Sequence, residues 1–175
     1  MSDGVPPEKR GSSQGVKGTG TTAWYRPWLR PKRLALVVLG LFLLAQLVPV
    51  WLLQTNPRVT GQPTWDGART ATLVMDACFD CHSNATTWPW YSHVAPVSWL
   101  VTQDVVRGRS HLNFSEWQTG VGYGGRSPAE LADRAARAVS SGDMPPSYYT
   151  IMHPKASLST AQRQELAAGL LASLK

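Results

Sequence analysis

Cysteine is scarce in this chain of 175 residues, which has only Cys78 and Cys81. Because no second cysteine pair exists, the sequence lacks the usual four-ligand pattern of a structural zinc site. It also lacks segments that alternate convincingly between apolar and polar residues, so the βαβ pattern of a thioredoxin-like redox domain is not expected. These absences predict a mostly α-helical protein whose single cysteine pair has another use.

Charge is missing from residues 34–53, and about twenty helical residues span the hydrocarbon core of a bilayer. Pro49 weakens the run only near its C-terminal end, where a kink costs less. Arg30, Lys32 and Arg33 precede the run directly, so the positive-inside rule places the N-terminus in the cytoplasm. We therefore predict a single-pass anchor in the cell membrane, with the rest of the chain outside the cytoplasm.

Two other interpretations of this run are a cleaved signal peptide and a buried core helix. A signal peptide has an apolar region of about 7–15 residues and a small-x-small cleavage site. This run is longer, and residues 53–57 offer no such site. A core helix of a soluble protein would have a polar face, which is absent here. Cleavage remains the main alternative, and it too would export the C-terminal part.

Basic residues are concentrated before the apolar run. Residues 1–33 contain seven Lys or Arg against two acidic residues, whereas residues 54–175 contain ten against nine. The net charge of +6 therefore belongs to the N-terminal segment, and we expect no nucleic-acid partner. Residues 1–33 are rich in Gly, Pro and Ser, which predicts a disordered cytoplasmic tail. Residues 54–64 are interpreted as a linker and residues 65–175 as the folded domain.

The cysteine pair is followed at once by a histidine, in the motif Cys78-Phe-Asp-Cys81-His82. This spacing is typical of c-type haem attachment. Two thiols on a short turn can each form a thioether with a haem vinyl group, and His82 can then be the proximal iron ligand. A disulfide is the other simple use of the pair, but it would close a tight loop and leave His82 without a role.

Periodic apolar residues predict a helix on each side of the motif. The first helix runs into the motif, and its predicted buried face consists of Ala71, Val74, Met75 and Cys78. Met75 is interpreted as a core residue and not as an iron ligand. The second helix is predicted from Pro96 to about residue 107, and its apolar stripe consists of Val97, Leu100, Val101 and Val105.

Capping signals predict two further helices. One begins after Ser127, runs to about Ser140 and is closed by Gly142. The last begins near Ser159, where Ser159 and Gln162 form the pattern of a capping box. Its predicted buried stripe consists of Leu166, Leu170 and Leu174.

Three aromatic residues follow the motif in a polar loop. Trp88, Trp90 and Tyr91 are predicted to cover the haem and to exclude water from it. A backbone carbonyl of the same loop is predicted to accept the Nδ1–H of His82 and thereby orient the ring.

A second axial ligand has five candidates after the motif, namely His93, His111, Met144, Met152 and His153. Met144 is favoured because two prolines follow it and stiffen the loop between the last two predicted helices. A thioether ligand raises the reduction potential of the iron and suits an electron carrier. His111, His153 and an open sixth position remain alternatives, whereas His93 is interpreted as a loop histidine.

Two stretches of the sequence resemble the haem-binding domain family, a group of bacterial proteins with a CxxCHS start. The first is residues 78–117, which contain the strings WPWYS, PVSW and HLNFSEW, and the second is residues 142–166, which begin GDMPPSYY. The second stretch is also similar to the Met-Pro loop and final helix of mono-haem cytochromes c. In all, the resemblance covers about residues 65–172.

The resemblance implies a small cytochrome-c-like helical domain that carries one covalently attached haem c. It implies thioethers at Cys78 and Cys81, proximal ligation by His82, and Met144 on the opposite side of the iron. It does not imply a substrate.

One-electron transfer is the leading functional hypothesis, with an electron carrier and not an enzyme as the predicted class. Its expected partners are membrane redox complexes or soluble electron carriers. A haem-based sensor or a peroxidase-like protein is the alternative, in which the sixth position is open and His111 or His153 is a distal acid–base group. A third hypothesis is a structural subunit that haem only stabilises.

Overall fold

A computed structural model describes residues 31–174, and within that range the chain is mostly helical and has no β-strand. The nearest approach to a sheet is an isolated bridge between Gly61 and Glu116. The predicted mostly α fold is therefore confirmed. The tail predicted for residues 1–33 falls almost entirely outside the described residues. The chain divides into two units, residues 1–38 and 39–175, and every contact of the candidate site lies within the second.

The apolar run begins as helix α1, Pro31–Ala45, and continues through a turn into a short 3-10 helix, Val50–Leu53. By length and composition Pro31–Leu53 can cross a membrane, and none of it is buried. The single helix predicted over residues 34–53 is nevertheless interrupted. The ring of Pro49 would clash with the carbonyl of Ala45, four residues earlier, and α1 ends at that residue.

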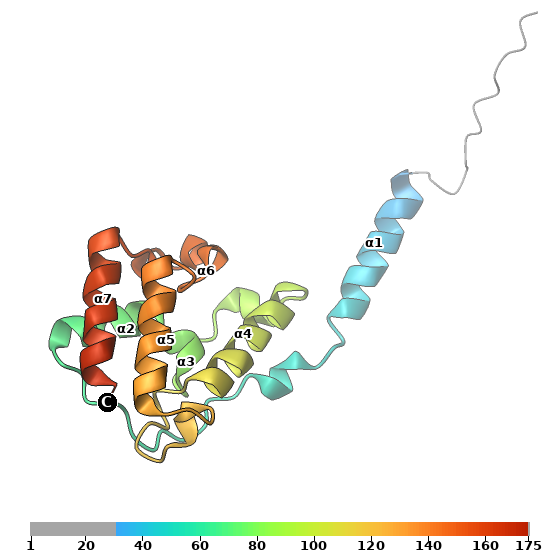
Figure 1. Cartoon of the computed structure of the whole chain (residues 1–175). Coiled ribbons are helices and arrows are strands. Elements are labelled where there is room, and N and C mark those ends of the chain that lie inside the picture. The colour runs from blue at the N-terminus through green and yellow to red at the C-terminus, as the bar shows by residue number, and fades with distance from the viewer. Residues whose placement is uncertain (1–30, 175) are drawn as a thin grey trace, which may run out of the picture. The chain divides into compact units, whose positions relative to one another are not determined.

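Six α-helices follow in the second unit (Figure 1). They are α2 (Ala68–Ala77), α3 (Phe79–His82), α4 (Val97–His111), α5 (Pro128–Ser141), α6 (Ser147–Met152) and α7 (Thr160–Ser173). Single 3-10 turns cover Trp90–His93, Val121–Tyr123 and Pro154–Ala156. Helices α5 and α7 lie side by side, and α2 packs across α7. The main core contains the predicted leucines of α7, which are Leu166, Leu170 and Leu174.

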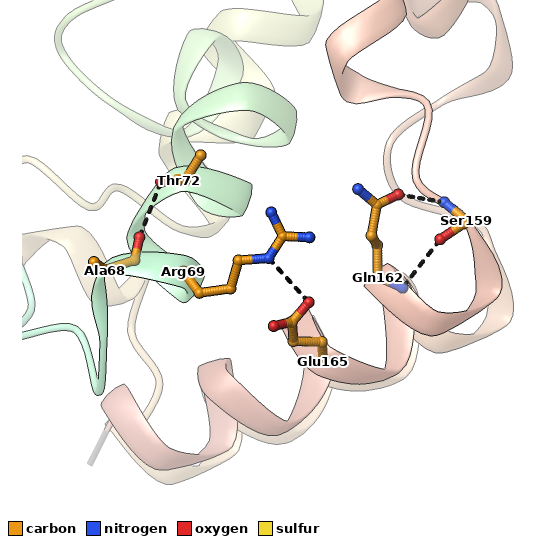
Figure 2. Close-up of polar contacts among 6 residues, drawn as sticks. All are labelled: Ala68, Arg69, Thr72, Ser159, Gln162 and Glu165. Carbon is orange, nitrogen blue, oxygen red and sulfur yellow. Dashed lines mark hydrogen bonds and ion pairs between the residues drawn. The ribbon is translucent and has the colours of Figure 1, made fainter.

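The predicted helix ends are confirmed at three places. The Ser127 side chain accepts a hydrogen bond from the backbone N–H of Glu130, and Gly142 closes α5 with a positive φ of 87°. Ser159 and Gln162 form the capping box that begins α7 (Figure 2). Local capping chemistry depends on residues three or four apart, which is why the sequence alone locates these ends.

The buried face of α2 differs from the predicted one. The helix buries Thr70, Leu73, Val74 and Ala77, and leaves Met75 59 % exposed. A Cβ at Gly169 of α7 would overlap the Thr70 side chain, so the two helices meet closely along the Thr70 face. The close approach turns Met75 outward. The salt bridge between Arg69 and Glu165 also joins α2 to α7 (Figure 2), but both side chains are about half exposed and it stabilises the pair little.

The apolar stripe predicted for α4 is also mostly outside the core. The helix buries Ser98, Thr102, Val105 and Gly108, of which only Val105 belongs to the predicted stripe. Val97 and Leu100 are 43 % and 44 % exposed. These two residues line a cavity instead, which is described below.

Candidate functional site

The cysteine motif lies where α2 ends and α3 begins. Cys78 ends α2, and the following residues form a single helical turn in which the His82 N–H donates to the Cys78 carbonyl at 2.9 Å. One turn of helix brings Cys78, Cys81 and His82 to the wall of one cavity. The two thiols are free and are not joined in a disulfide.

The His82 ring is oriented by a distant backbone carbonyl. Its Nδ1–H donates to the carbonyl oxygen of Leu112 at 3.0 Å, so Nε2 is the nitrogen that could bind a metal. The prediction that the acceptor lies in the loop after the motif is therefore wrong, because Leu112 follows the end of α4. Burial lowers the pKa of His82, although the hydrogen bond to Leu112 opposes this shift. A neutral imidazole is the form that binds a metal.

Gly108 allows α4 to approach the motif closely. A Cβ built at this position would overlap the carbonyl oxygen of Cys81. The glycine lies one turn before the end of α4, so the same helix contacts the motif and positions Leu112. Sequence reasoning missed this role because a glycine inside a helical pattern gives no sign of what it contacts.

A buried polar cluster fixes the segment after His82. The Asn113 side chain donates to Asn84 Oδ1 at 2.8 Å, and the Ser115 hydroxyl accepts from the Asn84 backbone N–H at 2.9 Å. The Phe114 N–H donates to the His82 carbonyl at 2.8 Å. Buried polar groups that are all hydrogen-bonded specify one arrangement of the chain. The string HLNFSEW thus acts by holding His82 at both its ring and its backbone.

Arg109 of α4 joins this loop to residues 54–64, which were predicted to form a linker. Its guanidinium donates to the Ser83 carbonyl at 2.7 Å, to Thr86 Oγ1 at 2.8 Å and to the Thr55 carbonyl at 2.7 Å. Planar Arg donors suit such a multiple contact. Sequence reasoning did not single out Arg109.

Two adjoining cavities, of about 260 Å³ and 220 Å³, surround the motif and are here called the motif cleft. They share the wall residues Ala77, Cys78, His82, His111 and Met144. Apolar residues of α5, α7 and the Phe114 segment form much of the remaining wall. Two cations also line the cleft, Arg107 in one part and Arg134 in the other.

Met144, the predicted sixth ligand, lines both parts of the motif cleft, as His82 does. Its backbone is fixed, because its N–H donates to the Ala138 carbonyl at 3.0 Å and its carbonyl accepts from Arg163 at 2.9 Å. The side chain is 39 % exposed.

The other four candidate ligands line different cavities of the protein. His111 lines both parts of the motif cleft. Met152 and His153 line another cavity, of about 310 Å³, whose wall contains neither His82 nor Met144. His93 lies elsewhere again, beside Gln54. The geometry therefore leaves Met144 and His111 as the candidates nearest the motif.

The three predicted cover residues lie away from the motif cleft. The Trp88 indole donates to Asn56 Oδ1 at 3.3 Å, and Trp90 is 74 % exposed. The Tyr91 hydroxyl is hydrogen-bonded to His153 Nε2 at 2.6 Å. Trp90 and Tyr91 line the 310 Å³ cavity, which reaches the motif only at Asp80 and Cys81.

The donors of the motif cleft fit a haem better than a bare metal ion. Two thiols, an imidazole with its Nδ1 satisfied and a thioether meet in one largely apolar space. Among residues 31–174, no group of three or more His, Cys, Asp or Glu residues is placed to hold a metal ion. Burial, with a smaller effect of the neighbouring charges, raises the pKa of Cys78 and of Cys81 to about 12. Reactive redox thiols show the opposite shift.

Comparison with known families gives one match. A family model described as a haem-binding domain matches residues 40–172, which is most of the chain and includes the whole motif cleft. The match begins at residue 40, earlier than the residue 65 at which the resemblance in the sequence was placed. Neither the curated proteins nor the solved structures give a match.

Proposed function

The chain belongs to the haem-binding domain family, and we propose that it is a membrane-anchored mono-haem c-type cytochrome that transfers single electrons outside the cytoplasm. Haem binding follows from the family. The observation that supports the finer proposal is that Cys78, Cys81, His82 and Met144 all line one cleft. Thiols are not needed to bind haem reversibly, so a pair of them beside a ligating histidine favours covalent attachment.

In this proposal Cys78 and Cys81 would hold the haem through thioethers, and His82 and Met144 would bind its iron. The chemistry that a bound haem supplies is one-electron oxidation and reduction of its iron. Leu112 fixes the orientation of the His82 ring, and the apolar walls exclude water. Arg107 and Arg134 are the cations available to pair with the haem propionates.

The helical run Pro31–Leu53 supports the membrane anchor, and the basic residues before it support an N-terminus in the cytoplasm. An anchored domain stays at high effective concentration near redox complexes of the same membrane. The partners proposed are therefore membrane redox complexes or soluble electron carriers that reach the outer side.

Acid–acetone extraction of the purified, denatured full chain tests covalent attachment. We expect the haem to stay with the polypeptide, and to be absent from a Cys78→Ser, Cys81→Ser double variant. Complete extraction of haem from the unsubstituted chain would contradict the proposal. Protease added to spheroplasts tests the topology, since it should digest residues 54–175.

His111 supports a second candidate function. It lines both parts of the motif cleft, as Met144 does, so a gas sensor or peroxidase-like protein with an open sixth position has a histidine at hand. Carbon monoxide added to the reduced protein separates the two functions. A six-coordinate carrier should bind it slowly or not at all, whereas an open site should bind it at once.

A further inference from the structure

The 310 Å³ cavity is distinct from the motif cleft and is here called the aromatic cavity. The two spaces share Cys81, Asp104, Tyr148 and Tyr149, but His82 and Met144 line only the cleft. Neither of the proposed iron ligands therefore lines the aromatic cavity. The stripe of α4 that sequence periodicity assigned to the core forms one wall of it, with Val97, Leu100, Val101 and Val105.

The size and surface of the aromatic cavity are those of a small-molecule site. Its volume is about 310 Å³, at the lower end of the range for ligand pockets. Its rim exposes large apolar side chains, including Trp90 and Met152, which are 74 % and 52 % exposed. Exposed apolar residues that cluster around a cavity are typical of a binding surface.

One wall of the cavity carries connected polar groups. The Tyr91 hydroxyl is hydrogen-bonded to His153 Nε2 at 2.6 Å. The His153 ring stacks on Tyr149 at a centroid distance of 4.1 Å and an interplanar angle of 10°. Tyr149 in turn donates to Asp80 Oδ2 at 2.8 Å, and Asp80 Oδ1 accepts from the Thr87 N–H at 3.0 Å. These contacts hold the polar wall in one arrangement.

The Tyr91–His153 pair can either accept a hydrogen bond from a ligand or donate one to it. If Tyr91 donates to Nε2, its oxygen still accepts a hydrogen bond, and if Nε2–H donates instead, the Tyr91 hydroxyl is free to donate. A hydroxyl group, which also donates and accepts, is the natural complement of such a pair. Anions are disfavoured, because the two charged side chains in the wall are the carboxylates Asp80 and Asp104.

We propose that the aromatic cavity binds a hydroxylated aromatic ring of the phenol or quinol class. The ring would lie between the α4 stripe and the rim formed by Trp90 and Met152, where aromatic and sulfur contacts favour it. The Tyr91 hydroxyl would donate to His153 Nε2, and the ring hydroxyl of the ligand would donate to the Tyr91 oxygen. This site goes beyond the proposed function, because Tyr91 and His153 line the aromatic cavity and neither lines the motif cleft.

Binding of 2-naphthol to the purified full chain tests the proposal, with 2-methoxynaphthalene as a probe of similar shape that cannot donate a hydrogen bond. Equilibrium dialysis against protein-free micelles corrects for partition into detergent. We expect saturable binding of 2-naphthol, at least about tenfold tighter than that of the methyl ether. Absence of saturable binding, or equal affinity for both probes, would overturn the proposal.

Matched variants of α4 locate the site. Leu100→Trp fills the cavity and should weaken 2-naphthol binding at least about tenfold, whereas Val106→Trp should leave it unchanged. Both residues are 44 % exposed and only Leu100 lines the cavity. If Leu100→Trp fails to fold, Val97→Trp replaces it. Equal effects at Leu100 and Val106 would contradict the location.

The double variant Tyr91→Phe, His153→Phe tests the hydrogen-bonding wall, because it keeps both rings and removes the Tyr91 hydroxyl and His153 Nε2. The variant should bind both probes alike, and a retained preference for 2-naphthol would exclude the Tyr91–His153 pair as the recognising group. The absorption spectrum of each sample reports haem separately. Unsubstituted protein that carries no haem and still binds 2-naphthol would contradict the cytochrome proposal and leave this site intact.

Discussion

The motif cleft and the aromatic cavity meet at Cys81 but are built in different ways. In the cleft, His82 is held by backbone groups, with Leu112 accepting from its ring and Phe114 donating to its carbonyl. In the aromatic cavity, side chains hold one another, and Tyr91, His153 and Tyr149 form the connected wall. Backbone contacts tolerate most substitutions of the residues that make them, whereas a side-chain wall changes with each substitution. The orientation of His82 therefore depends mainly on the backbone, whereas the wall of the aromatic cavity depends on which side chains form it.

Replacing both cysteines should have the largest effect and should separate the two spaces. The Cys78→Ser, Cys81→Ser variant loses both thioethers, so we expect no haem on the denatured chain. Binding of 2-naphthol should persist, because Tyr91 and His153 are unchanged and Cys81→Ser replaces one wall residue by a side chain of similar size. Extraction and dialysis on the same preparation measure both. Loss of naphthol binding together with the haem would show that the two spaces are one site.

Gly108→Ala should disturb the cleft through the backbone. The new Cβ would overlap the Cys81 carbonyl, so we expect the free energy of unfolding to fall by about 1–3 kcal/mol and the haem content to fall with it. Gly40→Ala, in the interior of α1, is the control, since a Cβ there meets nothing within 4 Å. Denaturant titration followed by circular dichroism measures both. Equal stability of the two variants would remove the role assigned to Gly108.

Met144→Ala should change the spectrum, the reduction potential and the ligand binding of the haem iron, and little else in the protein. We expect loss of the sulfur–iron charge-transfer band, a lower reduction potential and rapid binding of carbon monoxide, because a soft ligand is replaced by an open position. Met75→Ala is the matched control, as Met75 is 59 % exposed and lies outside the cleft. An unchanged spectrum in the Met144 variant would reassign the ligand, with His111→Ala as the next variant to measure.

Arg134→Gln should have the smallest effect. Removal of a cation from the cleft disfavours the reduced haem, so we expect a modest fall in reduction potential with full haem content. Arg134→Lys keeps the charge and should restore most of the potential, and redox titration compares the three proteins. A potential unchanged by Arg134→Gln would show that this side chain does not face the bound haem.

Sequence patterns identified the features of this fold that depend on near neighbours. The capping box at Ser159 and the leucines of α7 were predicted correctly, because residues three or four apart decide them. The motif also consists of near neighbours, since its three residues lie within one helical turn.

Features that depend on contacts between distant segments were missed or wrong. The acceptor of the His82 ring is a backbone carbonyl thirty positions away, and a backbone group leaves no mark in the sequence. The α4 stripe was assigned to the core because apolar periodicity cannot distinguish a core from a cavity wall. The face of α2 was wrong because Gly169, on another helix, decides it.

The mass of the denatured full chain tests the central claim most directly. Covalent attachment predicts one species heavier than the polypeptide by one haem, and the bare polypeptide mass for the Cys78→Ser, Cys81→Ser variant. A denatured chain with the bare polypeptide mass, from a preparation that showed haem absorption before denaturation, would contradict the covalent attachment on which the c-type assignment depends.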